Sequence, residues 1–296
     1  EAAKQLKGRE GSKVALTVFH TGDGAAKKIV LTRENIRIKT VLGDSRKPDG
    51  TWNFMLDSKR KIGYVRLTAF SRDTAAELRQ TLAELKSEGM RALILDLRFN
   101  PGGLLAAAIE TADLFVAEGR IVSAKGRTIP PRSWDARTEN TFAGFPMAVL
   151  VNRYSASASE IVAACLQDNR RAIVVGERTW GKGNVQNLIE LAPGHGAIKL
   201  TTSSYFRPNG KNIHRLPKAE DSDEWGVTPD EGYRIALENR EMLELIRYRR
   251  TRDILRSTAG EPEPEGTAPV GLRKFEDRQF EAAEKYLAAE LESKTG

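Results

Sequence analysis

The feature that most constrains the fold is an alternation of strand-like apolar runs with amphipathic helical segments between residues 61 and 176. The expected strands are residues 62–70, 92–97, 120–123, 147–152 and 172–175. The expected helices are residues 73–88, 104–115 and 157–167. Strands that alternate with helices in this way favour an α/β core with parallel strand pairs and right-handed crossover helices.

The segments on either side of this core have different patterns. Beyond residue 183 the sequence predicts strands at 184–191 and 197–205 and a polar extended segment at 207–215, then a helix at 240–256. A Glu/Pro/Gly-rich stretch at 260–271 predicts a linker before a last charged helix at 274–292. At the front, a short helix at 2–7 precedes strands at 13–20 and 28–33, joined by a turn at 21–24. These front elements are too few to hold a core, so we interpret them as the tail of a domain whose front half is missing from this chain.

Composition excludes several classes of protein and site. With 296 residues, 40% hydrophobic and 29% charged, and no run of eighteen apolar residues, the chain is neither disordered nor membrane-spanning. Cys165 is the one cysteine, so an internal disulfide and a Cys-rich metal site are excluded, and its apolar neighbours predict a small core residue. Of the three histidines, His195 and His214 lie in loops without a spaced partner for a metal. We therefore expect no metal and no cofactor.

The net charge of +7 does not by itself indicate nucleic acid. The densest basic cluster lies on the expected helix at 240–256 and interleaves with aromatic residues only at Tyr248. It consists of Arg247, Arg249, Arg250, Arg252 and Arg256. We expect it to be a solvated helix face, and we expect no nucleic-acid partner.

Three segments could carry chemistry, and each has a simpler structural interpretation. In segment 154–160, Ser157 and Glu160 fit a capping box at a helix start, but a serine at a strand-to-helix turn could also be a nucleophile. Segment 176–183 approaches the P-loop pattern, yet Gly183 stands where the Mg²⁺-binding hydroxyl would be and no clear helix follows. Segment 95–103 ends in Asn-Pro-Gly-Gly, which is either a tight turn or a source of open N–H groups for an oxyanion.

The order and spacing of these segments resemble the C-terminal processing peptidases, the tail-specific serine proteases of the S41 family. The family motifs LDLRxNPGG, SASASE and GERTxGKG match residues 95–103, 155–160 and 176–183. The resemblance implies that Ser157 is the nucleophile, that Lys182, 25 positions later, is the general base, and that Gln186 steadies the lysine. It also implies that the amides of Gly103 and Ala158 form the oxyanion hole. Gly102 and Asp168 are candidate supporting residues, and Asp168 alternatively fits a surface residue at a helix end.

A lysine can take the proton of a serine hydroxyl only in its neutral form. Burial disfavours the ammonium, so we expect Lys182 to lie in a dry environment, with Trp180 and Val185 as its walls. Gln186 could bond the amine without adding a negative charge.

The resemblance further implies a spiral crotonase/ClpP-like α/β peptidase core at 40–256, preceded at 1–39 by the C-terminal part of a PDZ domain. A linker at 257–271 and a C-terminal helix at 272–296 would follow. The implied function is a serine endopeptidase that cleaves unfolded or C-terminal protein and peptide substrates through an acyl-enzyme, in the periplasm, outside the cell or at a membrane. The alternative is a non-catalytic peptide- or small-ligand-binding member of the same fold, which would not need Ser157, Lys182 and Gln186 together.

Overall fold

The structure is a computed structural model that describes residues 2–19, 25–127, 129–192, 196–254 and 275–293. It divides into two compact units. Unit 1 comprises Glu1–Lys39 with Ser257–Arg273, and unit 2 comprises Thr40–Arg256 with Lys274–Gly296. The predicted turn at 21–24 and the predicted linker at 260–271 lie outside the described residues.

Unit 1 contains the expected short helix and hairpin. They are α1 (Ala2–Leu6), β1 (Lys13–Val18) and the antiparallel β2 (Lys27–Thr32). The Arg33 guanidinium joins the helix to the hairpin, because it donates to Gln5 O and Leu6 O at 2.9 Å each and to Ser12 Oγ at 2.9 Å. The last carbonyls of a helix have no intrahelical partner, so this arginine satisfies two of them.

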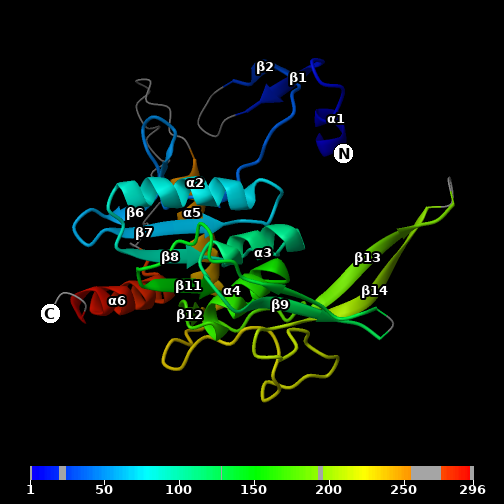
Figure 1. Cartoon of the computed structure of the whole chain (residues 1–296). Helices are drawn as coiled ribbons and strands as arrows, with labels where there is room; N and C mark the ends of the chain where they lie inside the picture. Colours follow the sequence, from blue (N-terminus) through cyan, green and yellow to red (C-terminus); the bar gives the residue numbers. More distant parts are fainter. Residues whose placement is uncertain (1, 20–24, 128, 193–195, 255–274, 294–296) are drawn as a thin grey trace. The chain divides into compact units, whose positions relative to one another are not determined.

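Unit 2 is built on a six-stranded sheet (Figure 1). Its four central strands are parallel, in the order β12-β11-β8-β7, and two short strands pair with β7 in the antiparallel sense. The parallel strands are β7 (Ile62–Leu67), β8 (Ala92–Asp96), β11 (Met147–Val151) and β12 (Ile173–Gly176), and the short ones are β3 (Val41–Leu42) and β6 (Met55–Asp57). The expected α/β core with parallel strands is confirmed.

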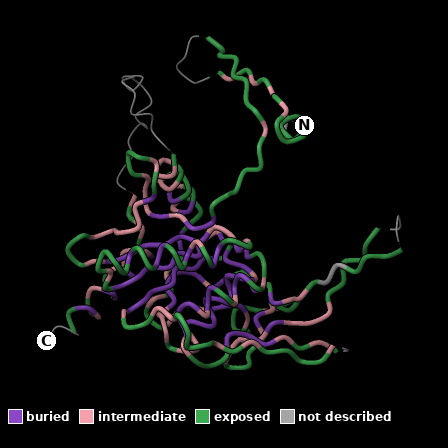
Figure 2. Tube along the Cα trace, turned by 45° about the horizontal axis from the view of Figure 1, so that its top comes forward, coloured by how far each residue is buried: buried purple, intermediate pink, exposed green. Residues whose placement is uncertain are grey.

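Helices cover both faces of this sheet, so its strands are buried on both sides (Figures 1 and 2). In β8, Leu93 and Leu95 join the core on one face, and Ala92 and Ile94 join the core on the other. The first face packs against α2 (Thr74–Ser87), α3 (Leu105–Asp113) and α4 (Ala158–Asp168), and the second against α6 (Arg278–Ser293). Cys165 is fully buried in α4, as expected.

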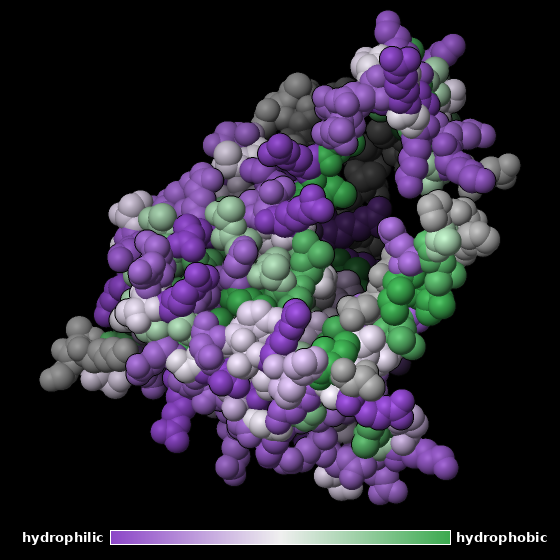
Figure 3. Space-filling view, turned by 45° about the vertical axis from the view of Figure 1, so that its right-hand side comes forward, coloured by the Kyte–Doolittle hydropathy of each residue, from purple (hydrophilic) through white to green (hydrophobic). Residues whose placement is uncertain are grey.

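A second sheet of four antiparallel strands has the order β10-β9-β14-β13. The strands are β9 (Arg120–Lys125), β10 (Arg132–Asp135), β13 (Asn184–Glu190) and β14 (Ala197–Phe206). The β13–β14 ribbon projects from the rest of unit 2 (Figure 1), and Ile189 pairs with Ile198 across it. Both side chains are nearly half exposed, and they contribute to the apolar surface of this ribbon (Figure 3).

Helix α5 (Asn239–Asp253) packs against a small ribbon of β4 (Ser45–Arg46) and β5 (Trp52–Asn53). The expectation that its arginines form a solvated face is wrong for two of them. Arg249 pairs with the fully buried Asp96, and its side chain is only 12% exposed. Arg252 pairs with Asp44. Ion pairs therefore connect helix α5 with Asp96 of the central sheet and with Asp44.

The segment at 207–215, predicted to be extended throughout, begins with a turn at 207–211 and is extended only after it, where Asn212 pairs with Phe206. Gly210 N–H donates to Arg207 O at 2.9 Å, and Lys211 N–H donates to Asn209 Oδ1 at 3.0 Å. The last helix begins later than predicted because Asp277 caps it. Its Oδ1 accepts the Phe280 N–H at 3.1 Å, which satisfies one of the free N–H groups of the first turn.

Candidate active site

Two loops that carry candidate residues leave the same edge of the central sheet, because β8 and β11 are parallel neighbours. The loop after β8 contains Gly102 and Gly103, and the turn after β11 contains Ser157. In open parallel sheets, ligands bind in the crevice outside the carboxyl ends of the strands. The fold therefore brings the candidate nucleophile and the candidate oxyanion glycines together at that edge.

Ser157 occupies a strained turn between β11 and α4. Its φ of 57° and ψ of −113° lie outside the regions that a serine ordinarily adopts. The neighbouring Ser155 holds the turn, because its hydroxyl donates to Leu97 O at 2.8 Å and accepts the Asn152 N–H at 3.0 Å. A strained backbone persists only where surrounding contacts hold it in place. In serine hydrolases, a strained turn between a strand and a helix exposes the nucleophilic serine hydroxyl.

Gly102 approaches this turn so closely that a side chain has no room. A Cβ at Gly102 would lie 2.7 Å from Ala156 O and 2.9 Å from Ser157 Cβ, and the residue has a φ of +100°. Asn100 fixes the approach: its Oδ1 accepts the Gly102 N–H at 2.9 Å, and its carbonyl accepts the Ala156 N–H at 3.0 Å. Gly102 thus contributes a close backbone contact, and its own N–H is already paired.

The peptide between Gly102 and Gly103 directs an N–H group away from Phe70. Phe70 N–H donates to Gly102 O at 3.0 Å, and the two ends of a trans peptide point in opposite directions, so the Gly103 N–H faces the other way. Ala158 is the first residue of α4, where N–H groups have no intrahelical partner. Within the described part of the chain, no hydrogen bond occupies either N–H. Two such donors next to a serine have the composition of an oxyanion hole.

The fully buried Glu160 connects the serine turn with the lysine loop. Its Oε2 accepts the backbone N–H of Ser157 at 2.7 Å and that of Lys182 at 2.8 Å. Its Oε1 accepts the Gly181 N–H at 2.6 Å and the Thr179 hydroxyl at 2.5 Å. One carboxylate therefore brings the backbones of Ser157 and Lys182 within hydrogen-bond distance of a single oxygen.

Burial raises the pKa of Glu160, and its four hydrogen bonds oppose that rise. The sequence indicated Glu160 only as the second member of a capping box. The Ser157 N–H bond of that box is present, but the same carboxylate also holds the Lys182 loop. Its position three residues after a serine was the available signal, and nothing local indicated the second partner.

The segment 176–183 is followed by β13 and not by a helix, which confirms that it is not a P-loop. The glycines on either side of Lys182 allow close packing. A Cβ at Gly183 would lie 2.3 Å from His214 N, and one at Gly181 would lie 2.7 Å from Arg215 Cβ. The loop is therefore pressed against the strand-like segment at 213–215.

The surroundings of the Lys182 side chain differ from expectation. Lys182 is exposed, and Trp180, expected to be one of its dry walls, is 58% exposed. No hydrogen bond of the described residues joins the Lys182 amine to the Ser157 hydroxyl. The expectation of a buried lysine is wrong for this structure, because only the backbone of the loop is enclosed. Gln186 lies at the start of β13, opposite Thr201, and is also exposed.

Asp168, at the end of α4, is not the surface residue that the sequence favoured. Its side chain is 9% exposed and forms an ion pair with Arg207, with a shortest distance of 2.6 Å. It also accepts from the Asn209 amide at 3.1 Å. These contacts fix the turn at 207–211, and none of the described contacts of Asp168 involves Ser157 or Lys182.

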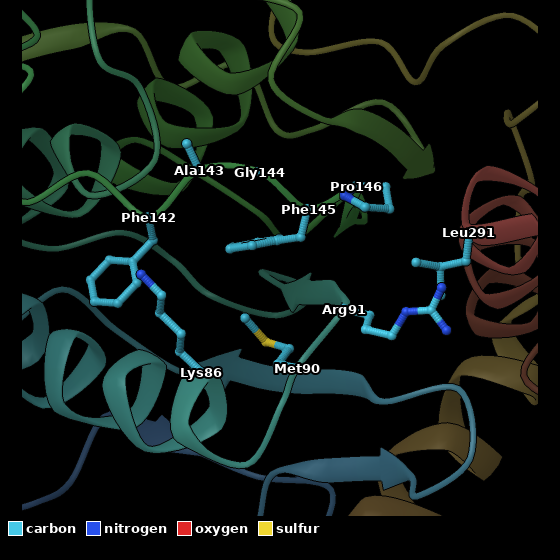
Figure 4. Close-up of a pocket in the computed structure, with 9 residues that line it drawn as sticks. All are labelled: Lys86, Met90, Arg91, Phe142, Ala143, Gly144, Phe145, Pro146 and Leu291. Atoms are coloured by element: carbon cyan, nitrogen blue, oxygen red, sulfur yellow. The ribbon is translucent and has the colours of Figure 1, made fainter. Parts of the chain in front are cut away.

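A cavity of about 330 Å³ lies elsewhere in unit 2 (Figure 4). Phe142, Phe145 and Met90 line it together with two cations, Lys86 and Arg91. Arg91 directly precedes β8, so this cavity lies at the amino ends of the strands, opposite the Ser157 edge. Its lining contains no serine, threonine, cysteine, histidine or carboxylate side chain. In the described residues, no group of three His, Cys, Asp or Glu side chains could hold a metal ion.

The sequence pattern of peptidase family S41 matches residues 61–232. The chain belongs to this family. Among the relatives of this chain, a carboxyl-terminal-processing protease of Synechocystis sp. is 39% identical over 234 residues, which cover 78% of this chain and 50% of that protein. A carboxy-terminal-processing protease of Bartonella bacilliformis is 36% identical over 235 residues, covering 78% and 49%.

The fold is also similar to that of a solved C-terminal processing protease. The photosystem II D1 C-terminal processing protease superposes with a TM-score of 0.55 and 29% sequence identity, covering 83% of this chain and 61% of that one. The chain spans about half the length of the curated relatives that it matches. In the part of the chain that the structure describes, no helix has the length and apolar composition needed to cross a membrane.

Proposed function

We propose that this chain carries the catalytic machinery of a serine endopeptidase that cleaves protein or peptide substrates near their C-termini. Ser157 is the nucleophile and Lys182 is the general base. The observation that carries the proposal is the shared acceptor: Glu160 holds the backbones of both residues against one oxygen, although they belong to different loops. Membership of family S41 and the names of its carboxyl-terminal-processing relatives support the same substrate class.

The proposed reaction has two halves. The Ser157 hydroxyl attacks the scissile carbonyl carbon while its proton passes to the neutral amine of Lys182. The N–H groups of Gly103 and Ala158 donate to the oxyanion that forms. The ammonium of Lys182 then gives its proton to the departing amine, which leaves an ester between Ser157 and the substrate. Water attacks this ester with Lys182 again as base, which releases the carboxylic acid product and restores the serine.

The Lys182 side chain is exposed to water in this structure. Water favours the ammonium form, so a lysine base needs a dry environment at the moment of proton transfer. We propose that the bound substrate supplies it. Tyr154 and Trp180 lie on the two loops and present 46% and 58% of their surface to solvent. A peptide lying across them would exclude water from both Ser157 and Lys182, with Gln186 left to accept a hydrogen bond from the lysine amine.

The same family resemblance supports two further proposals. We propose that residues 1–39 are the C-terminal part of a PDZ domain, and the short helix α1 and the antiparallel pair β1–β2 support this proposal. We also propose that the protein acts in the periplasm, outside the cell or at a membrane.

Hydrolysis of an unfolded protein tests the proposed function. A reduced and alkylated substrate is incubated with the wild type and with Ser157→Ala and Lys182→Ala, and the products are followed by intact mass. Loss of either dyad member should lower the rate by about 10⁴-fold or more. The matched controls are Ser87→Ala and Lys199→Ala, which alter exposed residues on α2 and β14 and should retain full activity. Binding of the substrate without any cleavage by the wild type would favour a non-catalytic, peptide-binding protein instead.

A further inference from the structure

Asp96 is the last residue of strand β8, and its side chain is buried. Three side chains from different parts of the chain form hydrogen bonds with its carboxylate. The Arg98 guanidinium bonds both of its oxygens, at 2.8 Å to Oδ2 and 3.1 Å to Oδ1. The Tyr64 hydroxyl on β7 donates to Oδ2 at 2.8 Å, and the guanidinium of Arg249 on α5 bonds the same oxygen. Asp96 is 0% exposed, so this carboxylate is held entirely by protein groups.

The charges of this cluster balance only when Arg249 is present. Arg98 also forms an ion pair with Asp277, before α6, at 2.8 Å. Two carboxylates thus face two guanidiniums. Burial alone would raise the pKa of Asp96, but Arg249 and Arg98 together hold it well below its usual range. Loss of one partner from a buried ionic cluster leaves an uncompensated charge, which forces the remaining groups to rearrange.

The groups that would rearrange belong to the loop that leads to the oxyanion glycines. The Asp96 carboxylate accepts the backbone N–H of Arg98 at 2.9 Å and so fixes the turn at the strand end. The next residue, Phe99, has a left-handed φ of 63°, and its N–H donates to Asn152 Oδ1 at 3.0 Å. Four residues later the chain reaches Gly103.

Arg249 contacts this turn on both sides of Arg98. Its guanidinium bonds Asp96 and also lies over the Phe99 ring, 5.4 Å from the ring centre. The Phe99 ring in turn stacks on Tyr154, in the serine segment, at 5.8 Å. A single side chain from α5 therefore touches the loop of the oxyanion glycines and, through one ring, the loop of the nucleophile.

We propose that Arg249 is a positioning residue, which holds the turn from Asp96 to Phe99 so that the Gly103 N–H faces the oxyanion. This inference rests on the proposed peptidase function and assigns a role in it to α5, which follows the segment matched by the family pattern. Displacement of a catalytic group by about 1 Å can cost on the order of 10²-fold in rate. The oxyanion is absent from the bound substrate and develops on the way to the tetrahedral intermediate, so its donors affect kcat more than KM.

Steady-state kinetics of the full chain on a peptide substrate test this role. Arg249→Ala should lower kcat by about tenfold to a hundredfold and leave KM within about twofold of the wild type. A peptide aldehyde, which forms a tetrahedral adduct on the serine, should lose affinity by the same factor as kcat/KM. Arg249→Lys keeps the charge but loses the planar group, so it should recover part of kcat. The control is Arg247→Ala, an exposed arginine on the same helix, which should match the wild type.

The outcomes separate this inference from the function on which it rests. An active wild type, with an Arg249→Ala variant that is folded at the assay temperature and retains full kcat, would overturn the inference alone. A rise in KM at unchanged kcat would overturn it too, because a positioning role predicts the opposite. If Arg249→Ala does not fold, Arg249→Lys decides by the same criteria. An inactive wild type would overturn the peptidase function and this inference with it.

Discussion

Ser157 and Lys182, 25 positions apart in the sequence, donate their backbone N–H groups to the same oxygen of Glu160, at 2.7 and 2.8 Å. The oxygen belongs to a fully buried side chain, so water cannot replace it. We therefore expect a change in this carboxylate to displace both the serine turn and the lysine loop. The relative position of the proposed nucleophile and the proposed base depends on one side chain that takes no part in the proposed proton transfers.

Replacement of Glu160 by Gln should damage both catalysis and stability. The amide nitrogen of Gln cannot accept the N–H groups that the carboxylate accepts, so at least one buried donor loses its partner. Such a loss costs about 1–3 kcal/mol, and misplacement of the dyad should lower kcat on the order of 10²-fold. Urea unfolding and steady-state kinetics measure the two effects. Glu118→Gln, at an exposed position, is the matched control, and equal behaviour of the two variants would contradict the role of Glu160.

A methyl group at position 102 should abolish activity without unfolding the chain. In Gly102→Ala the added Cβ would meet Ala156 O at 2.7 Å and Ser157 Cβ at 2.9 Å, so the serine turn must move. Gly144→Ala is the control for backbone strain. Gly144 has a similar φ of +90°, but no atom lies within 4 Å of its Cβ position, so this substitution adds the strain without the close contact. We expect a loss of hydrolysis in Gly102→Ala and wild-type hydrolysis in Gly144→Ala at matched temperatures below unfolding. Full activity of Gly102→Ala would show that the loop is not held against Ser157.

Acid should remove the stability that Glu177 contributes. Burial would raise the pKa of Glu177, but hydrogen bonds from Arg153 and from the Leu237 N–H, the latter at 2.6 Å, outweigh burial and lower it. A lowered pKa in the folded state means that the contribution is complete above the unfolded value of roughly 4.3 and is lost as the pH falls through the folded value. Wild type and Glu177→Gln should therefore differ in urea midpoint at about pH 7, and this difference should shrink steadily as the pH falls below the unfolded value. A difference that persists in acid would exclude this linkage.

Chelation should not affect the reaction. The chain has three histidines, and the described residues include no cluster of three His, Cys, Asp or Glu groups that could bind a metal ion. Hydrolysis in the presence of EDTA should therefore proceed at the same rate as without it. Inhibition by EDTA that added zinc reverses would point to a metal-dependent mechanism instead.

The central sheet and its helices could be predicted because their signals are local. Residues 92–96 are apolar throughout, and they form a strand that is buried on both faces. The helical spacing between residues 73 and 88 corresponds to α2 (Thr74–Ser87). The segments around Ser157 and Gly103 could be located for a similar reason, since a serine before a helix start and paired glycines after a strand are visible in the sequence itself.

The features that could not be predicted depend on partners far along the chain. Arg249 looked like one solvated arginine among five, and its partner Asp96 lies 153 positions away. The apolar neighbours of Lys182 suggested burial, but the sequence does not show which way Trp180 points, and it points largely into solvent. Segment 207–215 has the composition of an extended run, yet Asn209 and Gly210 turn it, and the ion pair between Arg207 and Asp168 fixes that turn.

The most direct test of the Ser157–Lys182 pair is the rate at which a fluorophosphonate labels the chain, measured by intact mass with the modified residue located by peptide mapping. A fluorophosphonate reacts with a serine whose hydroxyl is activated by a nearby base. We expect one adduct, on Ser157, that forms at the wild-type rate in the control Lys199→Met and at least about a hundredfold more slowly in Lys182→Met. An adduct on another residue, or labelling of Ser157 in Lys182→Met at the wild-type rate, would contradict the proposed dyad.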